Sequence, residues 1–383
     1  MNDSEQRTAI ILSGGGVRAA YQLGLLNCIQ ERIPDARFEI ITGTSAGAIN
    51  AAFLAAHRGP LSTAIRELVD IWSGLTFERI FRVDSSALGA NVAKWGLRLF
   101  SGGLEWVPEA RSLLDTAPLR ELLESSIATV DGEMVGIASN LDQDTLDAVA
   151  LTTLRYSTGQ TVTWIQGPDL QTWERPHRVS RRTRLTIEHV MASAALPILF
   201  PAIKLGRDWY GDGGVRLSNP LAPAIHLGAD RVLAISTRYP RSRAEADRPA
   251  VEGYPPPAQV LGTVLNSLFL DVIDQDALYL ERVNRLVRHV PEEERGRLRP
   301  VDLMVLRPSV DLGRLAADYE TDLPRAFRFL TRGLGTRRTE SPDFLSLLMF
   351  HPEYIAHLIE LGERDAKERS GELEGFFAET DTT

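Results

Sequence analysis

The chain has a single cysteine, Cys28, among its 383 residues. One thiol excludes an intrachain disulfide and any structural zinc site built on several cysteines. Cys28 lies between Leu26 and Ile29, a setting that predicts a packed helix position rather than a reactive thiol.

Long hydrophobic runs are also missing. The densest apolar stretch, residues 48–56, is about half as long as the ~18 residues that indicate a membrane span, and it contains Asn50. The first residues show no basic segment leading into an apolar one, so no signal peptide is expected. These absences predict a cytoplasmic location. They leave open peripheral contact with a membrane and secretion by a route that needs no cleaved signal.

Acidic residues outnumber basic ones: the chain has 42 Lys and Arg and 51 Asp and Glu, for a formal net charge of −9. Affinity for nucleic acid comes mostly from neutralised phosphates, so no nucleic-acid partner is expected. Membrane contact would have to be local and partly apolar. No metal-ligand pattern of the calcium-loop type is visible, which predicts calcium-independent activity, and no cofactor is expected.

The apolar runs that are present predict an α/β fold with a mainly parallel central sheet. A strand over residues 8–12 and a helix over 17–32 are followed by a strand over 38–42 and a helix over 48–57. This alternation is typical of parallel strands with helices on the sheet faces. Further strands are expected at 134–139, 146–153, 161–166, 209–210, 231–236 and 302–306, and helices over most of 61–130 and at 185–195, 219–227 and 258–289.

Residues 239–257 carry prolines among charged residues, which is typical of a linker or surface loop. They divide residues 8–238 from a mostly helical C-terminal region, 258–383. The strand expected at 302–306 leaves open whether that region adds to the main sheet or folds as an independent domain.

A candidate nucleophile lies in Gly43-Thr44-Ser45-Ala46-Gly47, between a predicted strand and a predicted helix. In G-x-S-x-G the serine occupies a strained strand-to-helix turn, so its neighbours two residues away, here Gly43 and Gly47, must be small. The helix N-terminus favours negative charge near the serine. The alternative is a tightly packed turn in which Ser45 caps the helix.

A second glycine-rich turn, Gly14-Gly15-Gly16, follows the first strand, with Arg18 at the start of the next helix. Successive backbone N–H groups in such a turn bind anions, and in acyl transfer the anion is the tetrahedral oxyanion. Arg18 either fixes the turn, adds positive potential, or is a surface residue.

The same turn has a rival interpretation, because Gly14-x-Gly16-x-x-Ala19 matches a dinucleotide fingerprint with Glu39 as the ribose-binding acid. Glu39 lies early in its strand, however, whereas that acid should lie at the strand's C-terminal end. The dinucleotide interpretation is therefore the less favoured one.

A serine nucleophile needs a base, which is usually histidine. No histidine lies in a glycine-rich turn at a strand end; the seven are His57, His177, His189, His226, His289, His351 and His357. Asp212, by contrast, lies in such a turn, Gly211-Asp212-Gly213-Gly214, where the flanking glycines permit close approach of another backbone. Asp212 is the candidate base. An ordinary Asp-Gly turn, and an α/β-hydrolase in which a histidine acts, are the alternatives.

Together, four blocks resemble the patatin-like phospholipase family. They are Gly14 to Arg18, Gly43 to Gly47, the run Ala192-Ser193-Ala194-Ala195-Leu196-Pro197-Ile198-Leu199-Phe200-Pro201, and Asp212-Gly213-Gly214, in family order across about residues 8–236. Ala19 departs from the glycine found in many relatives. The resemblance implies a three-layer fold and hydrolysis of fatty acyl esters through an acyl-enzyme. It also implies a Ser45–Asp212 dyad without histidine, and an oxyanion hole at Gly14 to Gly16 with Arg18 in support.

A lipid substrate requires contact with a bilayer or micelle, and two segments are candidates. The aromatic residues over 72–106, above all 95–100, are either an interfacial flap or core packing. A basic cluster is either a site for anionic head groups or a solvated loop. That cluster consists of Arg175, His177, Arg178, Arg181, Arg182 and Arg184.

Overall fold

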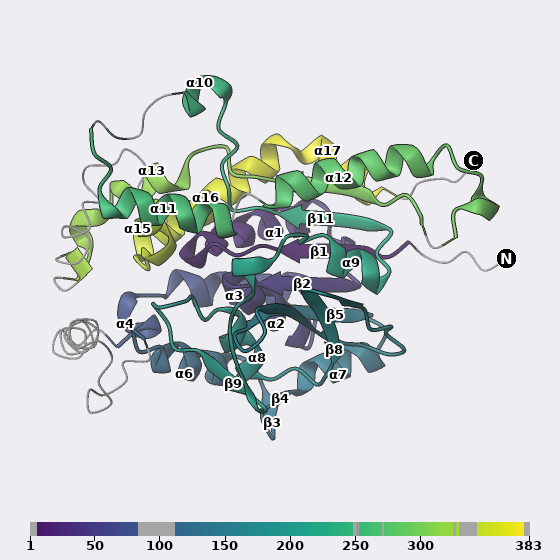
Figure 1. The fold of residues 1–383 in the computed structure, drawn as a ribbon, viewed down its shortest axis with the longest axis horizontal. Helices are drawn as coiled ribbons and strands as arrows, with labels where there is room; N and C mark the ends of the chain where they lie inside the picture. Colours follow the sequence, from purple (N-terminus) through teal and green to yellow (C-terminus); the bar gives the residue numbers. More distant parts are fainter. Residues whose placement is uncertain are drawn as a thin grey trace.

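A ten-stranded mixed sheet lies at the centre of the chain (Figure 1). The computed structural model describes residues 6–82, 112–247, 251, 253–269, 272–296, 298–324, 327–328 and 343–378. The main strand order is β12-β11-β1-β2-β5-β6-β8-β7, with β10 paired to β5 and β9 to β10. The strands are β1 (Thr8–Leu12), β2 (Ile40–Thr44), β5 (Ala148–Arg155), β6 (Gln160–Gln166), β7 (Glu174–Arg175), β8 (Arg178–Arg182), β9 (Ile203–Leu205), β10 (Asp208–Asp212), β11 (Arg231–Ile235) and β12 (Asp302–Leu306).

The five strands from β12 to β5 run parallel to one another, and β6 and β10 are antiparallel to β5. This arrangement confirms the predicted α/β class with a mostly parallel central sheet. A separate hairpin joins β3 (Thr129–Val130) to β4 (Glu133–Met134). The carboxyl ends of the parallel strands meet at one edge of the sheet, where open α/β sheets bind their ligands.

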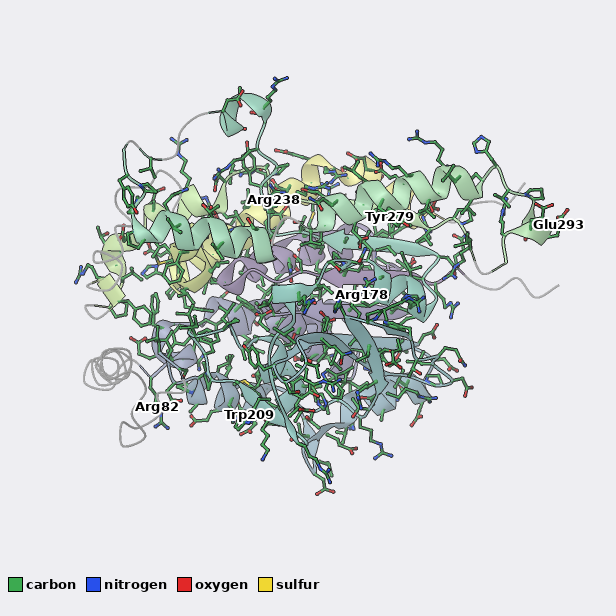
Figure 2. All side chains as sticks on the ribbon, viewed as in Figure 1. Arg82, Arg178, Trp209, Arg238, Tyr279 and Glu293 are labelled. Atoms are coloured by element: carbon green, nitrogen blue, oxygen red, sulfur yellow. The ribbon has the colours of Figure 1, made fainter. Side chains whose placement is uncertain are left out.

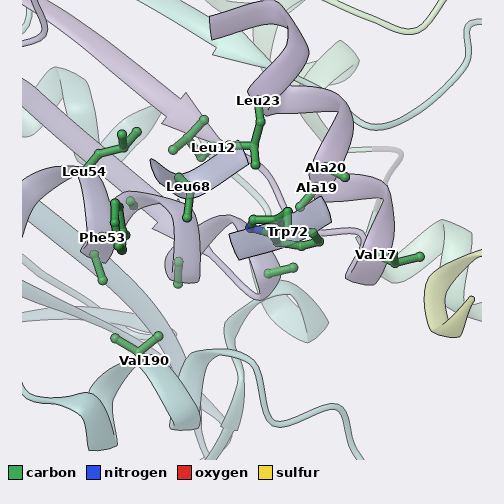
Figure 3. Close-up of a cluster of buried hydrophobic side chains, with 14 of the residues drawn as sticks. Leu12, Val17, Ala19, Ala20, Leu23, Phe53, Leu54, Leu68, Trp72 and Val190 are labelled. Carbon is green, nitrogen blue, oxygen red and sulfur yellow. The ribbon is translucent and has the colours of Figure 1, made fainter. Parts of the chain in front are cut away.

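Helices of the N-terminal half cover one sheet face. They are η1 (Gly16–Ala19), α1 (Ala20–Arg32), α2 (Ala46–Ala56), α3 (Leu61–Ser73), α4 (Phe77–Ile80), α6 (Ala117–Ser126), α7 (Val135–Asp142) and α8 (Ile187–Ser193). Figure 3 shows part of their core, where Leu12 of β1, Phe53 of α2 and Leu68 of α3 come together. Alanine, the strongest helix former, makes up most of α2, and its small side chains let that helix lie buried against β2.

The remaining helices belong mainly to the C-terminal region. They are η2 (Gly213–Arg216), α9 (Ala222–Leu227), α10 (Arg243–Ala246), α11 (Pro257–Phe269), α12 (Val272–Val287), η3 (Glu292–Glu294), α13 (Leu312–Ala317), η4 (Glu320–Asp322), α15 (Asp343–Leu348), α16 (Pro352–Glu368) and α17 (Ser370–Phe377). Residues of α9 and α12 pack on the sheet face opposite to α2. None of the helices within the described ranges is both long and apolar enough to cross a membrane.

The C-terminal region joins the rest of the chain through both strand and helix. β12 extends the main sheet by pairing with β11. α16 packs on α1 so closely that a side chain at Gly24 would overlap the carbonyl of Ile359. The predicted boundary at 239–257 contains the short helix α10, and the division into two regions stays a prediction.

One prediction of local structure was wrong. Residues 134–139 form mostly α7 rather than a strand, because small residues let this segment pack on α2: a side chain at Gly136 would overlap the carbonyl of Ala56. Asn140 of α7 then donates to the carbonyls of Ala55 and His57, which end α2. Residues 178–182 of the basic cluster, for which a solvated loop was one of two interpretations, pair with β6 as strand β8.

Candidate active site

Ser45 occupies the turn between β2 and α2, as predicted. Its φ of 57° and ψ of −132° lie in a region that non-glycine residues rarely adopt. Such strain costs about 1–3 kcal/mol and persists where the surroundings over-determine it. The neighbouring glycines explain how: a Cβ at Gly43 would come within 2.6 Å of the Ala51 Cβ, and one at Gly47 would overlap the Leu12 carbonyl.

Asp212 and Ser45 lie at the facing ends of two strands that both pair with β5. β2 ends where Thr44 pairs with Thr152, and β10 arrives from the opposite direction and ends where Asp212 pairs with Thr153. The two chain segments therefore follow one another along the same side of β5. The Ser45 hydroxyl donates to Asp212 Oδ2 at 2.6 Å.

The Asp212 carboxylate has no solvent exposure. Burial raises its pKa from the ordinary value of 3.8 to about 7, although hydrogen bonds from the Ser45 hydroxyl and the Gly214 N–H oppose the rise. The Gly214 bond, 2.8 Å to Oδ1, leaves Oδ2 aimed at Ser45. A group with such a pKa can exchange a proton with a hydroxyl near neutral pH.

The glycine turn lies directly beside Ser45, because a Cβ on Gly14 would come within 2.8 Å of the Ser45 Cβ. Gly15 and Gly16 have φ values of 143° and 57°, which glycine adopts without a side-chain clash. Within the described residues, the N–H groups of Gly14, Gly15 and Gly16 donate to no protein oxygen. Free donors beside a nucleophile are what an oxyanion requires.

The carbonyls of this turn are held by surrounding side chains. Gln22 donates to the Ser13 carbonyl at 2.8 Å, and Thr237 donates to the Gly14 carbonyl at 2.7 Å. Asn50 of α2 donates to both Ala19 and Gln22. These contacts tie the glycine turn to the helix that begins after Ser45.

Arg18 is buried, and its side chain is 3% exposed. Its guanidinium donates to Ser346 and forms an ion pair with Asp343 of α15. Of the alternatives for this residue, a surface position is therefore wrong.

Ser193 and Thr237 are site residues to which the sequence patterns assigned no role. The Ser193 hydroxyl accepts the Ser45 N–H at 3.0 Å and donates to the Thr152 carbonyl at 2.7 Å, which connects α8, the nucleophile turn and β5. Ser193 lies in the Ala192 to Pro197 block, and Thr237 follows the strand predicted at 231–236. Their positions at strand or helix ends facing one sheet edge were the available signal.

An apolar cavity lies beside Ser45. It lies between α2, α3, α6 and α15, and its wall includes Ile49, Phe53, Leu68, Leu122, Leu347 and Phe350. An almost entirely apolar lining of this kind is typical of sites for mostly apolar ligands.

The other candidate residues lie apart from this site. Neither Ser45 nor Asp212 hydrogen-bonds to any of the seven histidines, all of which are described. The His189 ring contacts Trp164, and burial lowers its pKa to about 4. Glu39 accepts the Thr8 N–H at the opposite end of the sheet, away from the glycine turn.

The two lipid-contact candidates have different outcomes. Trp72, Phe77 and Phe81 are buried in the core, whereas residues 95–100 lie outside the described residues. Most of the basic cluster is exposed around β7 and β8, where Arg178 (labelled in Figure 2) donates to Asn219 at 2.6 Å. Across the described ranges, no group of three or more His, Cys, Asp or Glu side chains is arranged to hold a metal ion.

Comparison with known proteins agrees with the sequence blocks. A family model for patatin-like phospholipase matches residues 10–225. No curated protein is detectably similar in sequence.

Several solved structures are similar in backbone arrangement at low sequence identity. Human GIVD cytosolic phospholipase A2 is 13% identical, with a TM-score of 0.48 over 98% of this chain and 60% of that one. VipD from Legionella pneumophila is 12% identical, with a TM-score of 0.33 over 90% of this chain and 67% of that one. The type III effector ExoU is 14% identical, with a TM-score of 0.35 over 97% of this chain and 53% of that one.

Proposed function

Because the chain belongs to the patatin-like phospholipase family, we propose that it is a calcium-independent lipid acyl hydrolase with a Ser45–Asp212 dyad. The observation that carries this proposal is the 2.6 Å hydrogen bond from the Ser45 hydroxyl to a fully buried carboxylate, beside free backbone N–H groups. Nucleophile, base and oxyanion donors are the three parts that acyl transfer needs.

In the first half-reaction, Asp212 Oδ2 takes the proton of the Ser45 hydroxyl while Ser45 Oγ attacks the ester carbonyl carbon. Negative charge moves to the former carbonyl oxygen, where the N–H groups of Gly14 to Gly16 stabilise it. The intermediate collapses, the carbon–oxygen bond of the ester breaks, and protonated Asp212 gives its proton to the departing alcohol. The fatty acyl group is then bound to Ser45 as an ester.

In the second half-reaction, water replaces the alcohol. Asp212 takes a proton from the water as its oxygen attacks the acyl carbon, and the same glycine N–H groups stabilise the second oxyanion. When that intermediate collapses, the bond to Ser45 breaks and the proton on Asp212 returns to Ser45 Oγ. Fatty acid leaves and the dyad is restored.

The apolar cavity supports a fatty acyl substrate. Ile49 and Phe53 lie one and two turns beyond Ser45 on α2, and Phe53 is eight residues from the nucleophile. At about 1.5 Å per residue, the wall from Ser45 to Phe53 extends about 12 Å. We propose that the acyl chain lies along this wall, and that the protein meets its substrate by peripheral contact with a lipid surface.

Filling this cavity should shorten the preferred acyl chain. We expect Ile49→Trp to lower kcat/KM for a 16-carbon ester at least about tenfold relative to a 4-carbon ester, because the larger ring occupies the path of the chain. Ile49→Val, which leaves the path open, is the matched control. Hydrolysis rates over a series of p-nitrophenyl esters measure the effect. An unchanged length preference in Ile49→Trp would place the acyl chain elsewhere.

The pH dependence should follow Asp212. The base must be ionised to accept a proton, and its pKa is about 7. We therefore expect kcat/KM to fall about tenfold per pH unit well below 7, to be half-maximal near pH 7, and to level off above it. A pH–rate profile with a short-chain ester tests this. A profile that is flat from pH 5 to 8 would contradict Asp212 as the base.

The proposed function is tested by incubating the protein with mixed phospholipid vesicles, triacylglycerol emulsion and a fatty acyl thioester, each with a calcium chelator present. Fatty acid release from one of them, lost in Ser45→Ala, supports the hydrolase and identifies its substrate class. Release that needs added calcium would contradict calcium independence. No release from any of the three would contradict the proposed function.

A further inference from the structure

The C-terminal region reaches the glycine turn through α15. A Cβ on Gly16 would overlap the Leu347 carbonyl, so the backbones of the turn and of α15 are in direct contact. Leu347 and Phe350 also form part of the cavity wall beside Ser45. The residues that follow position 342 therefore complete the site, although they lie beyond the match to the family model.

Arg18 connects the two segments. Its Nε donates to Ser346 Oγ at 2.8 Å, and its Nη2 donates to the same oxygen and to Asp343 Oδ1, the latter at 2.7 Å. Arg18 is 3% exposed and Asp343 is 14% exposed, so this ion pair is shielded from water. The Ser346 hydroxyl donates to the Asp343 carbonyl at 2.7 Å, which directs its lone pairs toward the guanidinium.

This connection bears on the oxyanion donors because of where Arg18 lies. It is part of η1, a four-residue helix that starts at Gly16, and its own N–H donates to the Gly15 carbonyl at 3.1 Å. Gln22 and Thr237 hold the carbonyls of Ser13 and Gly14, upstream of Gly15. The Arg18 side chain fixes the downstream end of the turn, together with Asn50, which donates to the Ala19 carbonyl.

We propose that Asp343 and Ser346 are positioning residues for the oxyanion hole. They hold the Arg18 guanidinium, and Arg18 holds η1 so that the Gly15 and Gly16 N–H groups face the substrate carbonyl. The inference rests on the proposed function for its catalytic consequence. A misplacement of about 1 Å at a reacting centre can cost about 100-fold in rate.

The test compares Asp343→Ala, Ser346→Ala and the conservative Asp343→Asn, which retains an oxygen that accepts from Arg18. Tyr21→Phe is the matched control. It removes a buried 2.9 Å hydrogen bond between the same two regions, from Tyr21 to Asp365, without touching the glycine turn. Two readouts are taken on each full-length variant: kcat and KM with a soluble ester, and amide hydrogen exchange of the peptide spanning residues 14–23.

Asp343→Ala should lower kcat about 10- to 100-fold while KM changes less than about threefold, because an oxyanion donor acts in the transition state. Ser346→Ala should have a smaller effect of the same kind, and Asp343→Asn should keep most of the activity. Exchange in residues 14–23 should accelerate in Asp343→Ala and Ser346→Ala but not in Tyr21→Phe.

Unchanged exchange of residues 14–23 in both alanine variants would overturn the proposal, whatever happens to activity. An equal fall of kcat in Tyr21→Phe would also overturn it, because general loosening between the regions would then be the cause. If the wild-type protein hydrolyses no ester, the proposed function fails, and the exchange measurement still decides whether Asp343 and Ser346 hold the turn.

Discussion

Replacing Ser45 with alanine should reduce fatty acid release at least about 10⁴-fold, because no other group can form the acyl-enzyme. The fold should survive, since alanine fits the space of serine between Gly43 and Gly47. Ser45→Ala is measured in the assay that uses the best lipid substrate, with circular dichroism as the check on folding.

The chain offers a matched control for this variant. The Ser309 hydroxyl also donates to a carboxylate at 2.6 Å, that of Asp365, but it lies outside the cavity. Ser309→Ala should keep its activity within about twofold of wild type. If Ser45→Ala retained more than about 1% of the wild-type rate, Ser45 would not be the nucleophile.

Asp212→Asn should have two opposite effects: loss of activity and gain of stability. Activity should fall at least about 10³-fold, because an amide cannot accept the serine proton. The folded-state pKa of Asp212, about 7, lies above its ordinary value of 3.8. Between these values the folded protein keeps a proton that the unfolded chain has lost, so this group makes stability fall as pH rises from about 4 to 7.

Asparagine removes that penalty. At about 1.4 kcal/mol per pH unit of difference, the free energy of unfolding should rise at pH 8 by up to about 4 kcal/mol, and the gain should shrink as pH is lowered toward 4. Denaturant unfolding of both proteins at pH 4.5 and pH 8 measures it. Full activity in Asp212→Asn would redirect the search for a base to the histidines. A gain that did not depend on pH would show that ionisation of Asp212 is not its source.

Ser45 and Asp212 could each be predicted as a site residue from the sequence, because each lies in a local pattern. Ser45 and Asp212 are flanked by glycines at strand ends, and a side chain there would overlap other segments: at Gly47 the Leu12 carbonyl, and at Gly213 the Thr152 carbonyl. Their hydrogen bond depends on strand register along β5, which the patterns of β2 and β10 do not contain. The resemblance to a family supplied the pairing that local reasoning left open.

Local sequence patterns could not identify contacts between residues far apart in the chain. Asp343 and Ser346 lie more than 300 residues from Arg18 in a segment without a motif, so nothing in the sequence connected them. Residues 134–139 were expected to form a strand, but packing of Gly136 on α2 selects a helix. Tertiary contacts decided both cases, and local propensity is weak against them.

The central claim, that Ser45 is a nucleophile activated by Asp212, is tested most directly by covalent labelling. The protein is treated with a long-chain alkyl fluorophosphonate at pH 8, digested, and the modified peptide identified by mass spectrometry. We predict one modification, on Ser45, in the wild-type protein, and a labelling rate at least about 100-fold lower in Asp212→Asn. Modification of another residue, or equal rates in the two proteins, would contradict the dyad.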